Sequence, residues 1–142
     1  MKEGAGAVSG SFNTKFPNQR VLAFGPHGNL VVLGGSQGWL HVCVWDGGTL
    51  AEKAILREHQ QVNQVVFPDG KTFVAVGNNP AVTFWNAQSL KLQKTWTNLH
   101  TPGHSAAFSA DGRHLVIGVP QNQVLAARLA PYDLEPLKAA LE

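Results

Sequence analysis

Charged residues and cysteine are scarce in this sequence, and each scarcity excludes a class of protein. Only 14% of the 142 residues are Asp, Glu, Lys or Arg, whereas there are 15 glycines and 8 prolines. This composition suits a β protein with many turns and argues against a coiled coil or a disordered chain. The single cysteine, Cys43, excludes an intrachain disulfide, and its position between Val42 and Val44 predicts a small buried side chain. A lone cysteine fits a reducing compartment.

Long apolar runs and runs of basic residues are also missing. The eleven Lys and Arg residues are scattered, so the sequence lacks the basic stripe that follows a phosphate backbone and does not favour nucleic-acid binding. No segment has the length needed to cross a membrane, and residues 1–8 lack the apolar stretch of a signal peptide. We therefore predict a cytoplasmic or nuclear protein with no membrane partner.

Motifs that carry chemistry are absent as well. The chain has no Gly-x-Ser-x-Gly, and Gly34-Gly35 lacks the Lys-Ser/Thr of a phosphate-binding loop. His100 and His104 lie four residues apart, but Pro102-Gly103 places them on a loop, and no cysteine pair or nearby carboxylate completes a metal site. We predict no catalytic, cofactor-binding or metal-binding residues.

A short phrase that begins with Phe and ends with Gly occurs three times. The three copies are Phe24-Gly25-Pro26-His27-Gly28, Phe67-Pro68-Asp69-Gly70 and Phe108-Ser109-Ala110-Asp111-Gly112. Their final glycines follow one another at intervals of 42 residues. A fixed period of this length indicates a repeat architecture, in which each unit must stack on its neighbours to bury its apolar face.

Each copy of the phrase lies between two short apolar runs, as expected of a strand, a tight turn and a second strand. The runs before it are 21–24, 62–67 and 105–108, and those after it are 30–34, 72–77 and 115–118. A third run follows a polar break at 40–45, 81–85 and 124–128, and a fourth, more polar run occupies 50–56 and 90–96. Four antiparallel strands in a unit of this length describe one blade of a β-propeller.

The repeats resemble the WD-repeat β-propeller family over roughly residues 20–129. Trp45-Asp46 matches the dipeptide that closes a repeat of the family, and Trp85-Asn86 is a near match. Gly103-His104 matches the dipeptide that opens a repeat, and His59 stands at the same place before the second repeat, where Glu58 replaces the glycine.

The third repeat departs from the family, because Arg128-Leu129 stands where Trp-Asp is expected. In the second repeat, Ala75 replaces the usual hydroxyl residue. The family's buried hydrogen-bond network of His, Ser or Thr, Asp and Trp is therefore predicted to be incomplete in every repeat. The phrase that ends in Asp111-Gly112-Arg113 also resembles, more distantly, the lactonase-like propellers.

From these patterns we expect an all-β fold, a partial β-propeller of about three four-stranded antiparallel blades followed by a short C-terminal helix. The predicted segments are an N-terminal segment (1–20), three repeats (21–61, 62–103 and the incomplete 104–129) and a helical tail (130–142). Asp133 would cap the helix and Pro136 would lie in its first turn. Residues 11–16 alternate polar and apolar side chains and are predicted to form one further strand.

Three repeats are too few for a closed ring, since propellers have four to eight blades. One hypothesis is a homodimer in which the N-terminal strand of each copy completes the third blade of the other, giving a six-bladed ring with two-fold symmetry. The alternatives are that the chain is a piece of a longer propeller, or an arc that associates with another propeller segment or a different protein.

The resemblance implies a non-catalytic scaffold for protein–protein interaction, or a subunit of a protein complex. In this family the loops on one face of the ring contact partners, and here those loops are rich in amides that dock a protein surface by hydrogen bonds. The candidate contact residues are Gln37, Trp39, Arg57, His59, Asn78, Asn79, His100, Gln121 and Asn122. The alternative is half of a lactonase-type hydrolase ring that is active only after assembly.

Overall fold

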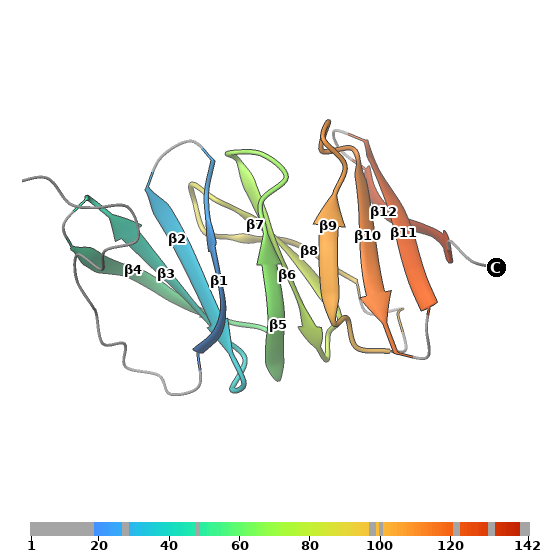
Figure 1. Cartoon of the computed structure of the whole chain (residues 1–142), viewed down its shortest axis with the longest axis horizontal. Helices are drawn as coiled ribbons and strands as arrows, with labels where there is room; N and C mark the ends of the chain where they lie inside the picture. Colours follow the sequence, from blue (N-terminus) through green and yellow to red (C-terminus); the bar gives the residue numbers. More distant parts are fainter. Residues whose placement is uncertain are drawn as a thin grey trace, which may run out of the picture.

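The computed structural model is built from antiparallel β-sheets (Figure 1). It describes residues 19–26, 29–47, 49–96, 99, 101–120, 123–130 and 133–139. Over these residues the chain forms twelve strands in three four-stranded sheets, and no helix. Within the same part of the chain, no helix is long and apolar enough to cross a membrane.

Each sheet contains four consecutive strands, and each strand pairs with its neighbours in sequence, as expected of strands joined by hairpins. The first sheet comprises β1 (Gln19–Phe24), β2 (Leu30–Gly35), β3 (Trp39–Trp45) and β4 (Leu50–Arg57). The second comprises β5 (Gln61–Val66), β6 (Thr72–Asn78), β7 (Val82–Asn86) and β8 (Leu92–Trp96). The third comprises β9 (Ser105–Phe108), β10 (His114–Val119), β11 (Gln123–Ala130) and β12 (Asp133–Ala139).

In the second and third sheets, the repeated phrases form the turns between the first and second strands. In the second sheet, Asp69 Oδ1 accepts hydrogen bonds from the backbone N–H groups of Lys71 at 2.8 Å and Thr72 at 3.0 Å. In the third sheet, Asp111 Oδ1 accepts from the N–H of Arg113 at 3.0 Å. An aspartate that bonds its own backbone a few residues ahead is a standard way to fix a turn. The turn function of both aspartates follows directly from these contacts.

The three sheets stack face to face, with their first strands β1, β5 and β9 next to one another (Figure 1). Apolar side chains from facing sheets form two cores. The core between the first and second sheets contains Val32, Leu40, Phe73 and Trp85, and the core between the second and third includes Phe84. Full burial of a phenylalanine such as Phe73 or Phe84 contributes on the order of 2–3 kcal/mol.

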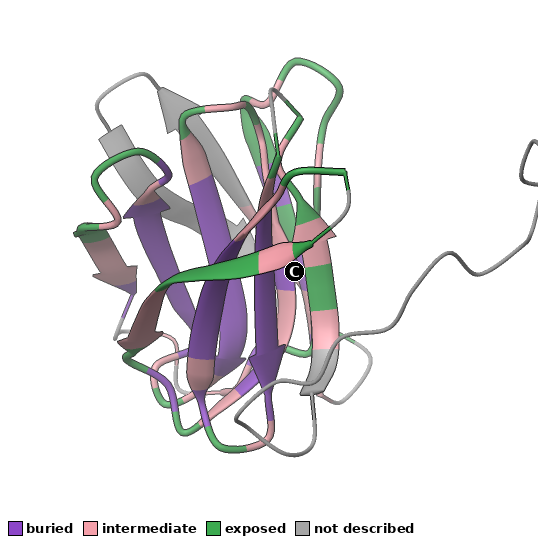
Figure 2. Cartoon of the chain, turned by 90° about the vertical axis from the view of Figure 1, so that its left-hand side faces the viewer, coloured by how far each residue is buried: buried purple, intermediate pink, exposed green. Residues whose placement is uncertain are grey.

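Burial follows this stacking. Buried residues run along the central strands, and exposed residues lie in the turns and on outer strands such as β4 (Figure 2). The predicted all-β arc of three four-stranded blades, a partial β-propeller, is therefore confirmed.

The predicted C-terminal helix is wrong. Asp133–Ala139 is strand β12, which pairs antiparallel with β11 through partners such as Leu129 with Leu134. Pairing in the sheet satisfies backbone groups that an isolated helix of this length leaves largely without partners. Pro136 is tolerated because β12 is an edge strand. The third sheet thus has four strands, one more than the sequence predicted.

This correction changes how a second copy can associate. The place beside β11 is occupied by β12 of the same chain, so the third sheet does not need a strand from another copy there. The predicted N-terminal strand at residues 11–16 lies outside the described residues.

Candidate functional site

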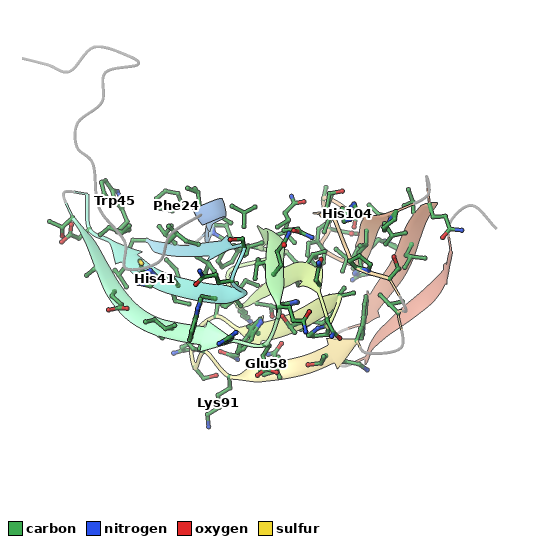
Figure 3. All side chains as sticks on the ribbon, turned by 90° about the horizontal axis from the view of Figure 1, so that it is seen from below. Phe24, His41, Trp45, Glu58, Lys91 and His104 are labelled. Carbon is green, nitrogen blue, oxygen red and sulfur yellow. The ribbon has the colours of Figure 1, made fainter. Side chains whose placement is uncertain are left out.

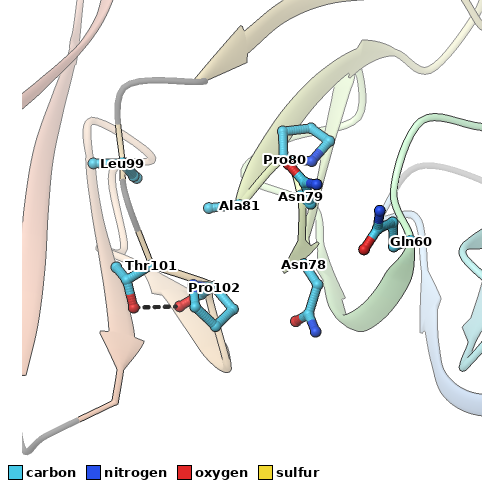
Figure 4. Close-up of a pocket in the computed structure, with 8 residues that line it drawn as sticks. All are labelled: Gln60, Asn78, Asn79, Pro80, Ala81, Leu99, Thr101 and Pro102. Carbon is cyan, nitrogen blue, oxygen red and sulfur yellow. Dashed lines mark hydrogen bonds between the residues drawn. The ribbon is translucent and has the colours of Figure 1, made fainter.

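A cleft opens where loops of the second and third sheets meet, at the end of the sheets that carries the β6–β7 turn (Figure 4). Its volume is about 430 Å³, and the described residues that line it offer amides, apolar side chains and one hydroxyl but no charged group. The lining residues are Gln60, Asn78, Asn79, Pro80, Ala81, Leu99, Thr101 and Pro102. Gln60, Asn78 and Asn79 lie toward one side, and Leu99, Thr101 and Pro102 lie toward the other.

The amide side of the cleft is built by the β6–β7 turn and by the segment that leads into β5. Asn79 has a φ of 44°, in the left-handed region that Asn tolerates better than most residues. The backbone N–H of Gln60 donates to the carbonyl oxygen of Asn78 at 3.0 Å, which joins the two segments. The segment before β9 is held in a similar way, since Gly103 N–H donates to the carbonyl of Gly77 at 2.9 Å.

A chain of amide hydrogen bonds orients Asn78. The Nε2 of Gln61 donates to Oδ1 of Asn63 at 2.7 Å, and Nδ2 of Asn63 donates to the carbonyl of Gly103 at 2.8 Å and to Oδ1 of Asn78 at 3.3 Å. Because Oδ1 of Asn78 accepts in this network, its NH₂ group is the end placed to donate to a ligand. Asn63 also ties the first strand of the second sheet to the segment that precedes the third.

His59 stabilises the β6–β7 turn, which forms part of the amide side of the cleft. The residue is only 2% exposed, and Nδ1 of its ring lies 2.7 Å from the carbonyl oxygen of Pro80. Nε2 lies 2.7 Å from Oγ1 of Thr83, which accepts a hydrogen bond from Nε1 of Trp85 at 2.8 Å. A carbonyl can only accept, so Nδ1 carries the hydrogen and neutral Nε2 accepts from the Thr83 hydroxyl. Every polar atom of the network is then satisfied, and the β6–β7 turn is fixed to the loop before β5.

This network shows how the second sheet obtains a buried hydroxyl although Ala75 lacks one. Ala75 offers no hydroxyl in β6, but Thr83 lies directly opposite it on β7 and supplies the hydroxyl from there. His59, Thr83 and Trp85 therefore form one hydrogen-bonded network that joins β7 to the loop before β5.

The same burial controls the protonation of His59. Burial lowers the pKa of His59 to about 4, although the hydrogen bonds to the Pro80 and Asn78 backbone act in the opposite direction. The neutral ring is also the form that the network requires, because a protonated Nε2 no longer accepts from Thr83.

We expect the free energy of unfolding to decrease between pH 7 and pH 5, with about 2 kcal/mol of the decrease due to His59. The unfolded chain binds a proton near pH 6.5, whereas the folded chain binds it only near pH 4, so acid favours unfolding across this window. Urea denaturation at the two pH values measures the effect. His59→Gln, which cannot titrate, is the control and should lose this part of the pH dependence. An unchanged pH dependence in the control would contradict the assignment.

The predicted contact residues do not lie together on one surface of the structure. Asn78 and Asn79 line the cleft. Gln37 is exposed in the β2–β3 turn, whereas the guanidinium of Arg57 lies 4.8 Å from the ring centre of half-buried Trp39, a cation–π arrangement on the first sheet. The proposed contact by His59 is wrong, because its ring is buried and engaged inside the protein. His100, Gln121 and Asn122 lie outside the described residues.

Several lining residues were not among the individual candidate contacts, although they lie in loops that were expected to face a partner. Gln60, Thr101 and Pro102 lie in the segments that join one sheet to the next, so their position between repeats is a usable signal. For Thr83 the sequence offered a weaker signal, which is its position two residues before Trp85.

The chemistry available at the cleft is hydrogen bonding and apolar contact. Within the described ranges, no group of three or more His, Cys, Asp or Glu residues is placed to hold a metal ion. Cys43 lies on the first sheet, away from the cleft lining, and burial together with the charge of Glu52 raises the pKa of its thiol. A thiol that keeps its proton is a poor nucleophile.

Comparison with known proteins adds no family to this description. No protein-family model matches the chain, and a search of curated proteins finds no match. The function is therefore inferred from the geometry of the site.

Proposed function

We propose that this chain is a non-catalytic binding module of the WD-repeat type, which holds an extended segment of a partner protein in the cleft between the second and third sheets. The observation that carries the proposal is the uncharged cleft itself, with an amide side and a largely apolar side on a hydrogen-bonded frame. Its volume of about 430 Å³ falls within the range of about 300–1,000 Å³ usual for ligand pockets.

An uncharged peptide segment fits this lining better than a charged ligand. The side chains of Gln60 and Asn79 can each donate and accept, and the NH₂ group of Asn78 can donate, which matches the alternating N–H and C=O groups of an extended backbone. Leu99 and Pro102 offer apolar surface to a side chain of the same segment. A charged group would lose hydration without meeting an opposite charge in the lining.

The WD-repeat part of the proposal is supported by the buried network of His59, Thr83 and Trp85. It joins the loop before β5 to β7, as the family's network joins the opening histidine to the closing tryptophan. The lining residues that the structure describes include neither a carboxylate nor a cysteine, so no observation at this site favours the hydrolase alternative.

The proposal is tested by selecting binders from a displayed library of random peptides and measuring their affinity by fluorescence anisotropy. We expect the double variant Gln60→Ala, Asn79→Gly to bind the selected peptides at least about tenfold more weakly, a loss of about 1.4 kcal/mol. Both side chains are exposed, and glycine tolerates the φ of 44° at position 79, so the fold should be retained.

The matched control is Gln88→Ala, which removes an exposed amide from the β7–β8 turn at the opposite end of β7. This variant should bind the peptides as the unchanged protein does. The proposal fails if no peptide is selected, or if the control and the cleft variant lose affinity equally.

A further inference from the structure

The three sheets repeat one register, so a position in one sheet has counterparts in the other two. Val32, Val74 and Val116 occupy the same place in the second strand of their sheets. Val32 and Val74 are 0% exposed, because each is covered by the sheet that follows. Val116 is 41% exposed, and it lies on the face of the third sheet that points away from the second.

In the described part of the chain, the first sheet has an uncovered face as well, on the side that points away from the second sheet. Leu22, Val65 and Ala106 are counterparts in the first strands, and their exposed fractions are 67%, 4% and 8%. Val65 and Ala106 are covered by the sheet that precedes theirs, and Leu22 has no such sheet among the described residues. Phe24 is 54% exposed, whereas its counterparts Phe67 and Phe108 pack against the two cores.

The surroundings of Leu22 and Phe24 are also apolar. On the same face of the first sheet, Val31, Leu33 and Cys43 form a buried cluster against which Trp45 and Leu50 pack. Phe24 and Trp45 project from the same side of this sheet (Figure 3). On this face, Nε2 of His41 lies 3.1 Å from Oε2 of Glu52.

The chain contains two internal interfaces between neighbouring sheets. The Val116 face of the third sheet corresponds to one side of such an interface, and the Leu22–Phe24 face of the first sheet corresponds to the other side. In both internal interfaces the valine of one sheet and the first-strand residue of the next share a core, as Val32 does with Val65 and Val74 with Ala106. A second copy of the chain offers the missing half to each outer face.

We propose that two copies close into a ring of six sheets, in which the Val116 face of each copy packs on the Leu22–Phe24 face of the other. Two copies are favoured because propellers have four to eight blades, so six sheets fit this range and nine do not. The contact joins unlike faces and occurs twice, which closes the assembly. The faces pack without exchange of strands, and the association does not depend on the cleft.

The test begins with the mass in solution of the full chain, measured by light scattering on a sizing column. We expect a dimer of twice 15.2 kDa. Val116→Glu and Leu22→Lys, each alone, should halve the mass because a charge then faces an apolar surface. Both positions are exposed in the single chain, so circular dichroism and the melting temperature should show that each variant remains folded.

Mixing the two variants makes the test specific to contact between unlike faces. In the mixed dimer one junction is unchanged, and the other places the introduced glutamate beside the introduced lysine, so the dimer mass should return. Leu92→Glu is the matched control, because Leu92 is 40% exposed on the edge strand β8 and lies on neither outer face. Its mass should equal that of the unchanged chain.

Three results would overturn the proposal. The first is a monomeric mass for the unchanged chain. The second is a dimer that persists in Val116→Glu, which indicates pairing of like faces. The third is a mass that grows with concentration, which indicates an open chain of copies and excludes a closed ring.

Discussion

Replacing Gly38 with alanine is expected to lower the free energy of unfolding by about 4 kcal/mol, the largest effect predicted for this chain. Gly38 has a φ of +84°, which costs a residue with a side chain about 1–2 kcal/mol. An added Cβ would also overlap the backbone carbonyl oxygen of His59. Overpacking against backbone costs a further 1–3 kcal/mol, roughly, because neither partner can rotate away. Urea denaturation followed by tryptophan fluorescence measures the change.

Gly47→Ala separates the two causes. Gly47 has a φ of +90°, but an added Cβ would meet nothing within 4 Å. This control should therefore cost only about 1 kcal/mol, the price of the backbone conformation. The excess in Gly38→Ala then reports the contact between the β2–β3 turn and the loop of His59. Equal losses in the two variants would show that this contact is unimportant.

Thr83→Val is expected to destabilise the protein by about 3 kcal/mol. The substitution keeps the shape of the side chain and removes the hydroxyl, so Nε2 of His59 and Nε1–H of Trp85 both lose their buried partner. Each buried polar group without a partner costs about 1–3 kcal/mol. The same denaturation experiment gives the magnitude, and the fluorescence of Trp85 should also change in the folded protein.

The control for Thr83→Val is the same substitution on the adjacent strand. Thr95 lies opposite Thr83 on β8, is half-buried and takes no part in the His59 network. Thr95→Val should change the free energy of unfolding by less than about 1 kcal/mol. If the two valine variants have similar stability, the network does not hold the second sheet to its preceding loop.

The apolar runs and turn phrases predicted most of the strands correctly because both signals are local. A strand that pairs with its sequence neighbour through a tight turn needs only a few adjacent residues to specify it. The segment Asp133–Ala139 was predicted to be a helix and is strand β12. Its composition favours a helix, but pairing with β11 supplies backbone partners, and such context overrides weak propensity.

The candidate site was predicted less well than the fold. The sequence placed Asn78 and Asn79 in a turn at the correct end of the sheets, but it did not show that Leu99 and Pro102 face them across a cleft. His59 was proposed as a contact because the sequence placed it in a loop. Its ring is held by Pro80 and Thr83, which lie more than twenty positions away in the sequence.

By itself the sequence determined the period, the hairpins and the division into three units that must stack, because repetition and turn chemistry are written in consecutive residues. Only the tertiary structure decided which side chains meet between units: the hydroxyl that Thr83 supplies in place of Ala75, the cleft between the second and third sheets, and the two outer faces. These features depend on the register of strands and on the stacking of sheets. Both are set by contacts between residues distant in the chain, which a pattern of neighbours does not contain.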